Sequence, residues 1–400
     1  MNSRERIIAT INHKTPDKLA IDFGAMRSTG ISIYAYDRLR NYLGINKGLP
    51  KLYDVFQQLA EPEMEVLERL GGDVVQAHRM YPSFGISIKN WREETLSNGV
   101  KCLVPQDYRP LIKEDKSQEI IQNGKVIAKM PSSGNYFDIV GAELGYIETL
   151  DDVKQIKIDI ISDEELDFIE NEVKDLYFNT DKAILMCFGG NILEAGETMW
   201  GFEKFLEYML VEPELVHAWL EKLTAAYMQD LDKLMPRVAP YINVIQFGDD
   251  LGSQMSSLIS KKSYIEMIKP YHKQLFKYIQ KNYPDIKVFL HSCGAIFDLI
   301  PELIDAGVQI LNPVQISAAG MDPVKLKSEF GKDLVFWGGG ANMQNTVLNG
   351  SIEEIKKEVG ELIDIFSTGG GYVFNQVHNI QSNVSPEKIM AIYDTALAKR

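Results

Sequence analysis

The feature that most constrains the fold of this chain is a regular alternation of apolar segments with amphipathic ones. Eight short apolar runs have the composition of buried strands. Between them lie longer segments in which apolar residues recur at helical spacing. Strands that are apolar on both faces and alternate with helices indicate a parallel sheet covered on both sides. The eight runs are residues 18–23, 73–78, 183–188, 241–247, 287–291, 308–312, 334–337 and 372–375.

The number eight favours a (β/α)8 barrel, or TIM barrel, within the α/β class. A doubly wound sheet is disfavoured because no Gly-x-Gly-x-x-Gly motif follows the first predicted strand. Residues 79–147 have a different pattern, in which polar and apolar residues alternate and Ser97-Asn-Gly99 and Gln122-Asn-Gly124 are typical of hairpin turns. We therefore predict a single barrel domain over residues 1–400, with an antiparallel β insertion at 79–147.

Composition narrows the class of function. The formal net charge of −14 argues against nucleic acid or an anionic membrane as the main partner, because both require a basic face. The 3 cysteines are too scattered for a disulfide framework, and the start of the chain lacks an apolar export segment. No run approaches the roughly 20 apolar residues of a membrane span. We expect a cytoplasmic protein with reduced thiols.

A candidate metal site lies at the end of the fifth predicted strand. His291 and Cys293 are separated by one residue, so their side chains point the same way if the strand continues through both. Imidazole and thiolate are common ligands of zinc. A His-x-Cys pair alone is a weak signal, because buried free cysteines and hydrogen-bonded core histidines produce the same pattern.

The barrel supplies further candidate ligands, since the carboxyl ends of all its strands meet at one face. His378 follows the last predicted strand and can provide a third zinc ligand there. Glu194 or Glu197, after the third strand, could add an oxygen ligand that substrate displaces, as an open catalytic zinc site requires. Alternatively, the two glutamates form a charge pair at a helix start. We assign Glu194 to the metal and Glu197 to catalysis.

Other polar residues at the strand ends are candidates for catalysis or substrate binding. Asp249 and Asp250 are candidate catalytic carboxylates, unless they only cap a helix. Arg27 lies in a glycine-bounded loop and could meet an anionic substrate group, or it could point into solvent. The remaining candidates for substrate binding are Asn312, Gln315 and Gln376. Histidines in helical segments are predicted to lie on the surface: His13, His217 and His272.

With these motifs placed, the chain resembles the uroporphyrinogen decarboxylase superfamily over nearly its whole length. The resemblance implies a (β/α)8 barrel and one of two activities, metal-free decarboxylation of porphyrinogens or zinc-dependent methyl transfer with a corrinoid protein. The matching segments are Arg4-Glu-Arg-Ile-Ile-Ala-Thr-Ile-Asn-His, Gly201-Phe-Glu-Lys-Phe-Leu, Asp249-Asp-Leu-Gly-Ser-Gln, His291-Ser-Cys-Gly, Asn312-Pro-Val-Gln, Trp337-Gly-Gly and Ser385-Pro-Glu-Lys-Ile.

Two departures sort the chain between these branches. The decarboxylases hold a tetrapyrrole with many carboxylates in an arginine-rich loop. Here Gly24-Ala-Met-Arg-Ser-Thr-Gly30 has one arginine, and the Arg-Gln-Ala-Gly-Arg-Tyr signature is missing. The methyltransferases have His-x-Cys and a further ligand, usually cysteine, after the last strand. His378 takes that position here, which keeps the site competent for zinc but makes the metal less electron-rich and a thiol substrate less suited.

The resemblance therefore implies a zinc-dependent methyltransferase acting between a small methylated substrate, methoxylated in our interpretation, and the cobalt of a corrinoid (cobalamin). A separate corrinoid protein is expected, because the Asp-x-His-x-x-Gly loop of corrinoid domains is absent. Two alternatives stay open, a metal-free decarboxylase of another acid and a non-catalytic protein that binds a small molecule or corrinoid. The direction of transfer and the formation of a homodimer are also left open.

Overall fold

The computed structural model describes residues 1–400, and its centre is a parallel sheet of 8 strands. From β4 to β15 each strand pairs with the next barrel strand along the chain, and β16 also pairs with β1, so β1 and β4 are the two strands that do not pair with each other. Every strand overlaps one of the predicted apolar runs. The strands are β1 (Ala20–Ile21), β4 (Val74–Ala77), β11 (Ala183–Gly189), β12 (Val244–Gly248), β13 (Lys287–His291), β14 (Ile310–Asn312), β15 (Val335–Trp337) and β16 (Tyr372–Phe374).

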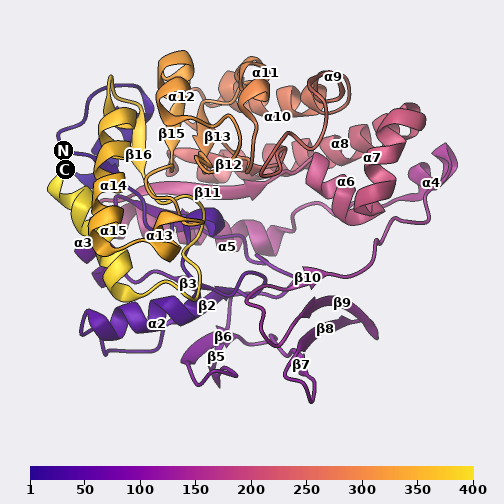
Figure 1. The fold of residues 1–400 in the computed structure, drawn as a ribbon. Helices are drawn as coiled ribbons and strands as arrows, with labels where there is room; N and C mark the ends of the chain where they lie inside the picture. Colours follow the sequence, from indigo (N-terminus) through magenta and orange to yellow (C-terminus); the bar gives the residue numbers. More distant parts are fainter.

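Helices surround this sheet, and each barrel strand is followed by at least one helix (Figure 1). The predicted (β/α)8 barrel is therefore confirmed. A π-helical turn at Tyr264–Ile268 joins two of the helices. The helices are α1 (Ser3–Ile11), α2 (Ile33–Tyr42), α3 (Met64–Leu70), α4 (Leu150–Gln155), α5 (Asp163–Asn179), α6 (Leu193–Trp200), α7 (Phe202–Val211), α8 (Pro213–Val238), α9 (Lys261–Ser263), α10 (Lys269–Asn282), α11 (Ile300–Ala306), α12 (Pro323–Phe330), α13 (Thr346–Asn349), α14 (Ile352–Ser367) and α15 (Pro386–Ala398).

The predicted antiparallel insertion is present, but strands from an earlier part of the chain join it. One 4-stranded sheet has the order β10-β9-β8-β7, and the other has the order β3-β2-β6-β5 (Figure 1). Because β2 and β3 precede β4, the β-rich region is not confined to residues 79–147. Its strands are β2 (Lys51–Asp54), β3 (Leu59–Glu61), β5 (Trp91–Thr95), β6 (Lys101–Pro105), β7 (Leu111–Ile112), β8 (Gln118–Gln122), β9 (Lys125–Met130) and β10 (Asp138–Ile139).

Apolar side chains from every barrel strand fill the barrel interior. They belong to a cluster of 14 buried residues that includes Val74 from β4, Phe289 from β13 and Trp337 from β15. Helix α1 contributes Ile7 and Ile11 to the same cluster and contacts β1, β11 and β16. This helix closes the amino-terminal end of the barrel, which leaves the carboxyl end for a functional site.

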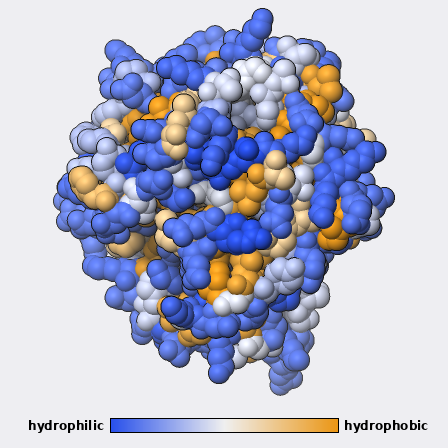
Figure 2. Space-filling model, turned by 90° about the vertical axis from the view of Figure 1, so that its left-hand side faces the viewer, coloured by the Kyte–Doolittle hydropathy of each residue, from blue (hydrophilic) through white to orange (hydrophobic).

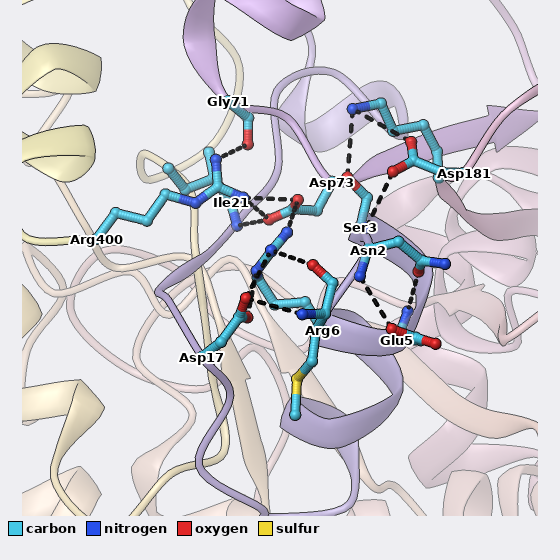
Figure 3. Close-up of polar contacts among 12 residues, drawn as sticks. Asn2, Ser3, Glu5, Arg6, Asp17, Ile21, Gly71, Asp73, Asp181 and Arg400 are labelled. Carbon is cyan, nitrogen blue, oxygen red and sulfur yellow. Dashed lines mark hydrogen bonds and ion pairs between the residues drawn. The ribbon is translucent and has the colours of Figure 1, made fainter.

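Strands β1 and β4 share no ladder of backbone hydrogen bonds, and a buried carboxylate joins them at this seam instead. The backbone N–H of Asp73 donates to the carbonyl of Ile21 (2.7 Å), and the Oδ2 of Asp73 accepts the N–H of Ile21 (3.0 Å). The same carboxylate binds Arg6 from α1 and Arg400 after α15, each at 2.7 Å (Figure 3). Its side chain is only 1% exposed, so the two guanidinium groups compensate a charge that water does not reach.

The face that carries both chain termini is mainly hydrophilic, and its apolar residues lie in separate spots (Figure 2). Helices α14 and α15 direct their apolar residues into the core, where Ile355, Val359, Ile389 and Ile392 are buried. None of the helices combines the length and the apolar content needed to span a membrane.

We predict that Asp73→Ala lowers the free energy of unfolding by about 3–5 kcal/mol, because the guanidinium of Arg400 loses its carboxylate and that of Arg6 keeps only Asp17. Urea unfolding followed by circular dichroism measures this loss. Asp394→Ala is the matched control, since it removes the acid of the Arg69–Asp394 pair, whose side chains are 45% and 48% exposed. That change should stay within about 1 kcal/mol. Equal effects of the two substitutions would contradict the assigned role of Asp73.

Candidate metal centre and cavity

His291, Cys293 and His378 lie together at the carboxyl end of the barrel. Strand β13 ends at His291, Cys293 lies in the loop that follows, and His378 lies after β16. The Nε2 of His291 is 3.5 Å from the Sγ of Cys293, and one ligand atom of each residue lies within 4.8 Å of the other two. Tetrahedral zinc places a nitrogen and a sulfur ligand about 3.6 Å apart. The spacing of the pair therefore fits such an ion.

The turn that carries Cys293 depends on Gly294. This glycine has φ +88°, and a Cβ here would lie 2.3 Å from the backbone of Gly252, so a larger residue does not fit. Side chains from the neighbouring loops hold the turn. Asp250 Oδ1 accepts the N–H of Cys293 (2.7 Å), and Gln315 Oε1 accepts the N–H of Gly294 (2.8 Å). The loops after β12 and β14 thus position the thiol.

A chain of hydrogen bonds from the barrel core orients the ring of His291. Asn312 Nδ2 donates to the carbonyl of Trp337 (2.8 Å), so the Oδ1 of Asn312 accepts the Nδ1–H of His291 (2.6 Å). Trp337 Nε1 in turn donates to the buried carboxylate of Asp22 (2.8 Å). With its proton on Nδ1, His291 keeps the Nε2 lone pair that a metal requires.

His378 has a backbone conformation that is rare for a residue with a side chain, with φ +60°. Its carbonyl accepts a hydrogen bond from Gln376 Nε2 (2.9 Å), and the Oε1 of Gln376 accepts one from Tyr393 (2.6 Å). Burial, reinforced by the nearby His291 ring, lowers the pKa of His378 to about 4. The ring is therefore neutral at pH 7 and keeps a free lone pair.

Two carboxylates lie beside the cluster. Asp250 Oδ1 is 3.6 Å from the Nε2 of His291. Glu194 Oε2 accepts the N–H of Asp250 (3.0 Å) and the side-chain amide of Asn191 (2.5 Å). Burial, together with the charges of Asp250 and Asp249, raises the pKa of Glu194 well above its usual range. The same causes raise the pKa of Glu197 to about 7, but Glu197 does not line the cavity described next.

A cavity of about 400 Å³ adjoins the cluster, and Glu194, Asp250, His291 and His378 line part of its wall. Adjacent strands β4, β11 and β12 add polar side chains to the lining, and aromatic rings add an apolar surface. The polar side chains from these strands are Gln76, Cys187 and Gln246, and the rings are Tyr53, Phe56, Tyr81 and Phe188.

Both arginines of the cavity, Arg27 and Arg79, are already paired with acids. The guanidinium of Arg27 binds Asp54, whose side chain is fully buried, and Arg79 binds Glu165 through two bonds of 2.6 and 3.2 Å. Arg27 lines the cavity, but its charge is compensated by an internal acid. The expectation that it binds a substrate carboxylate stays a prediction, and such a substrate would share the guanidinium with Asp54.

Asp249 does not line the cavity, because its carboxylate forms hydrogen bonds inside the protein. Its two oxygens accept the N–H groups of Leu193 and Glu194 at the start of α6, each at 2.8 Å. It also contacts the Nε2 of His272 at 3.0 Å. The helix-cap alternative that we considered for Asp249 is thus the one observed. The prediction that His272 is a surface residue is wrong, since it is 1% exposed.

The three predicted substrate-binding amides do not line the cavity either. Asn312 accepts a hydrogen bond from His291, Gln315 accepts one from the N–H of Gly294, and Gln376 donates one to the carbonyl of His378. They are therefore positioning residues for the cluster. Of the lining residues that we did not anticipate, Tyr53, Gln76, Cys187, Phe188 and Gln246 lie within strands, and Phe56, Arg79 and Tyr81 lie in loops that follow β2 and β4. An inward polar residue in an otherwise apolar strand, such as Gln246, is the signal that could have revealed the cavity.

The fold and the cluster define a (β/α)8 barrel of the kind that carries active sites at its carboxyl end. A model of the uroporphyrinogen decarboxylase (URO-D) family matches residues 142–398, and the chain belongs to this family. The uroporphyrinogen decarboxylase of Chlorobium limicola is 29% identical over 207 residues, which cover 50% of this chain and 53% of that protein. That of Chloroherpeton thalassium is 27% identical over 202 residues, which cover 50% and 52%. The chain thus spans about half the length of these curated relatives.

Among solved structures, a methyltransferase from Methanosarcina mazei superposes with a TM-score of 0.63 and 13% sequence identity. The match covers 100% of this chain and 99% of that one. At this identity the likeness concerns the fold.

We predict that Asp249→Ala lowers the free energy of unfolding by about 2–4 kcal/mol, because α6 loses its cap and His272 loses its buried partner. Asp250→Ala is the comparison, since that side chain is 36% exposed. It should cost about 1 kcal/mol or less. Urea unfolding measures both variants, and a larger loss for Asp250→Ala would overturn this division of roles.

A second prediction concerns pH. Burial raises the pKa of Asp22 from 3.8 to about 6, so the folded protein binds more protons than the unfolded chain between these values. The free energy of unfolding contributed by Asp22 therefore falls as pH rises through this window, by about 3 kcal/mol in total. Asp22→Asn carries no charge. The free energy of unfolding of Asp22→Asn, measured by urea unfolding, should therefore rise by about 3 kcal/mol relative to that of the parent from pH 4 to pH 7. A difference between the two proteins that does not change with pH would refute the raised pKa of Asp22.

Proposed function

We propose that this protein is a zinc-dependent methyltransferase that moves a methyl group from a small methoxylated substrate to the cobalt of a corrinoid on a separate protein. The observation that carries the proposal is the convergence of His291, Cys293 and His378 beside a small cavity at the carboxyl end of the barrel. Imidazole and thiolate ligands with a further position available are what an open zinc site requires.

The two histidines of the cluster fit zinc in their protonation. The hydrogen bond from His291 to Asn312 leaves Nε2 free, and His378 is neutral. Burial, together with the charges of Asp250 and Glu194, raises the pKa of the Cys293 thiol, so metal binding has to displace its proton. Zinc bound here would act as a Lewis acid toward the oxygen that loses its methyl group.

The chain's own residues divide the remaining work. Asn312, Gln315 and Gln376 hold the three ligands in place. Asp250 and Glu194 are the two candidates for a fourth, displaceable ligand, and Asp250 lies 3.6 Å from His291. Of the predicted catalytic carboxylates, Asp250 alone lines the cavity, so we assign substrate contact to it and not to Asp249 or Glu197.

Decarboxylation of a porphyrinogen is the competing function, because the matched curated relatives are named uroporphyrinogen decarboxylase. A substrate with many carboxylates needs cations that are free to bind it. In the cavity, however, Arg27 is paired with Asp54 and Arg79 with Glu165. The cavity of about 400 Å³ also suits a small ligand. These features favour methyl transfer over decarboxylation.

We predict about one zinc per chain in the purified protein, measured by elemental analysis, and loss of that zinc in His291→Ala, Cys293→Ser and His378→Ala. Asn312→Ala should weaken zinc binding about 10- to 100-fold, because the ring of His291 loses the group that orients it. Cys102→Ser and His217→Ala are the matched controls, since neither residue belongs to the cluster. Both should keep their zinc.

Activity is tested with the zinc-loaded protein, cob(I)alamin and a panel of small methoxylated compounds, by the absorbance change that accompanies methylation of cobalt. Methyl transfer should disappear with a chelator and return with zinc. If the parent protein binds no zinc, or if the chelator leaves turnover unchanged, the proposal is refuted in favour of a metal-free decarboxylase. Bound zinc without transfer to any compound of the panel would favour a binding protein.

A further inference from the structure

Two residues that line the cavity each have a buried polar atom with no hydrogen-bond partner in the protein. Tyr53 is 2% exposed, and its hydroxyl is buried without a bond. The Oε1 of Gln76 is also buried and unpaired. Both residues line the cavity, Tyr53 from β2 and Gln76 from β4. Buried polar atoms without partners are costly and therefore rare, which points to a ligand that supplies the missing bonds.

Four other polar side chains of the lining already have partners. Gln246 accepts a hydrogen bond from the Cys187 thiol (2.7 Å) and donates one to the carbonyl of Phe247 (2.8 Å). Arg27 and Arg79 are neutralised by Asp54 and Glu165. The lining therefore includes a tyrosine and a glutamine that each have an unpaired atom, whereas both of its arginines are paired with acids. A carboxylate would lose its hydration there without gaining a counter-charge, whereas an uncharged group that donates and accepts would gain two bonds.

We propose that Tyr53 and Gln76 form a recognition pair for the methyl donor, and that they bind an uncharged group on it, a carboxamide or hydroxyl that both donates and accepts hydrogen bonds. This inference rests on the proposed function, in which the methoxy end of the same molecule meets the cluster of His291, Cys293 and His378. The rings of Phe56 and Phe188 in the same lining offer an apolar surface to the body of such a molecule.

The test uses three probes that share a methoxy-substituted ring and differ only at the opposite position: 4-methoxybenzamide, 4-methoxybenzoate and 4-methylanisole. Isothermal titration calorimetry with the full-length, zinc-loaded protein gives each dissociation constant. 4-Methoxybenzamide should bind about tenfold more tightly than either other probe. Tyr53→Phe and Gln76→Leu should each remove about tenfold of that affinity and leave binding of 4-methylanisole as tight or tighter.

Tyr372→Phe is the matched control. The Tyr372 hydroxyl is also buried and unpaired, and its residue is 3% exposed, but it does not line the cavity. Each Phe variant removes an unpaired buried hydroxyl, so both should melt at or above the temperature of the parent, and only Tyr53→Phe should weaken binding of 4-methoxybenzamide. Tighter binding of the carboxylate, no effect of Tyr53→Phe, or no binding of any probe would overturn the recognition pair.

The binding assay contains no corrinoid, so the two proposals can fail separately. If the protein prefers the carboxamide probe and Tyr53→Phe removes this preference, the recognition pair is supported. This holds even if no methyl group reaches cob(I)alamin, a result that would refute only the methyltransferase function. Methyl transfer that Tyr53→Phe and Gln76→Leu leave unchanged, with the three probes bound equally, would overturn the recognition pair and leave the methyltransferase function standing.

Discussion

The barrel depends on one buried carboxylate, because the strands at its seam do not pair with each other. Asp73 joins β1 to β4 and also binds arginines from the first helix and from the end of the chain. The seam bears directly on the functional end of the barrel. The turn after β1 carries Arg27, and β4 carries Gln76, so the two sides of the seam contribute to one cavity. The ion pairs of Asp73 thereby join the two strands that lead to these cavity residues.

The cluster itself is assembled by amide side chains. Asn312 links the ring of His291 to a backbone carbonyl, Gln315 holds the N–H of Gly294, and Gln376 holds the carbonyl of His378. An amide has a donor at one atom and an acceptor at the other, so it can connect a core group to a ligand without bringing in a charge. Carboxylates in these positions would add negative charge beside Asp250 and Glu194. The choice of amides keeps the cluster close to neutral before a cation binds.

Much of the fold could be predicted from the sequence, because a strand buried on both faces has to be apolar and the helices between strands have to be amphipathic. The ends of the predicted strands were then enough to bring His291, Cys293 and His378 to one face. Strands β2 and β3 were not predicted, because they are short and their apolar residues show no clear period. Tyr53 in β2 was missed for the same reason.

The direction of side chains could not be predicted, because it depends on partners that are distant in the sequence. Arg27 is compensated by Asp54 in a strand that was not anticipated, and Asp249 is held by a helix that starts 56 residues earlier. Both residues occupy the expected loops, but the partners that they bind there were not predicted. A strand end thus identifies which residues gather at a face, whereas their partners decide which of them a ligand can meet.

The charge balance of the cavity is what separates the two activities considered for this chain, since both are compatible with the same barrel. Near the cluster, Cys293, Asp250 and Glu194 can supply negative charge to a cation. Elsewhere in the lining the cations are cancelled by Asp54 and Glu165, and the unpaired groups are a phenol and an amide. A polyanionic substrate would meet the acids without finding a free arginine. A neutral molecule with a polar end would need no counter-charge, and a divalent ion beside it could displace protons from Cys293 and Glu194 and gain their charge.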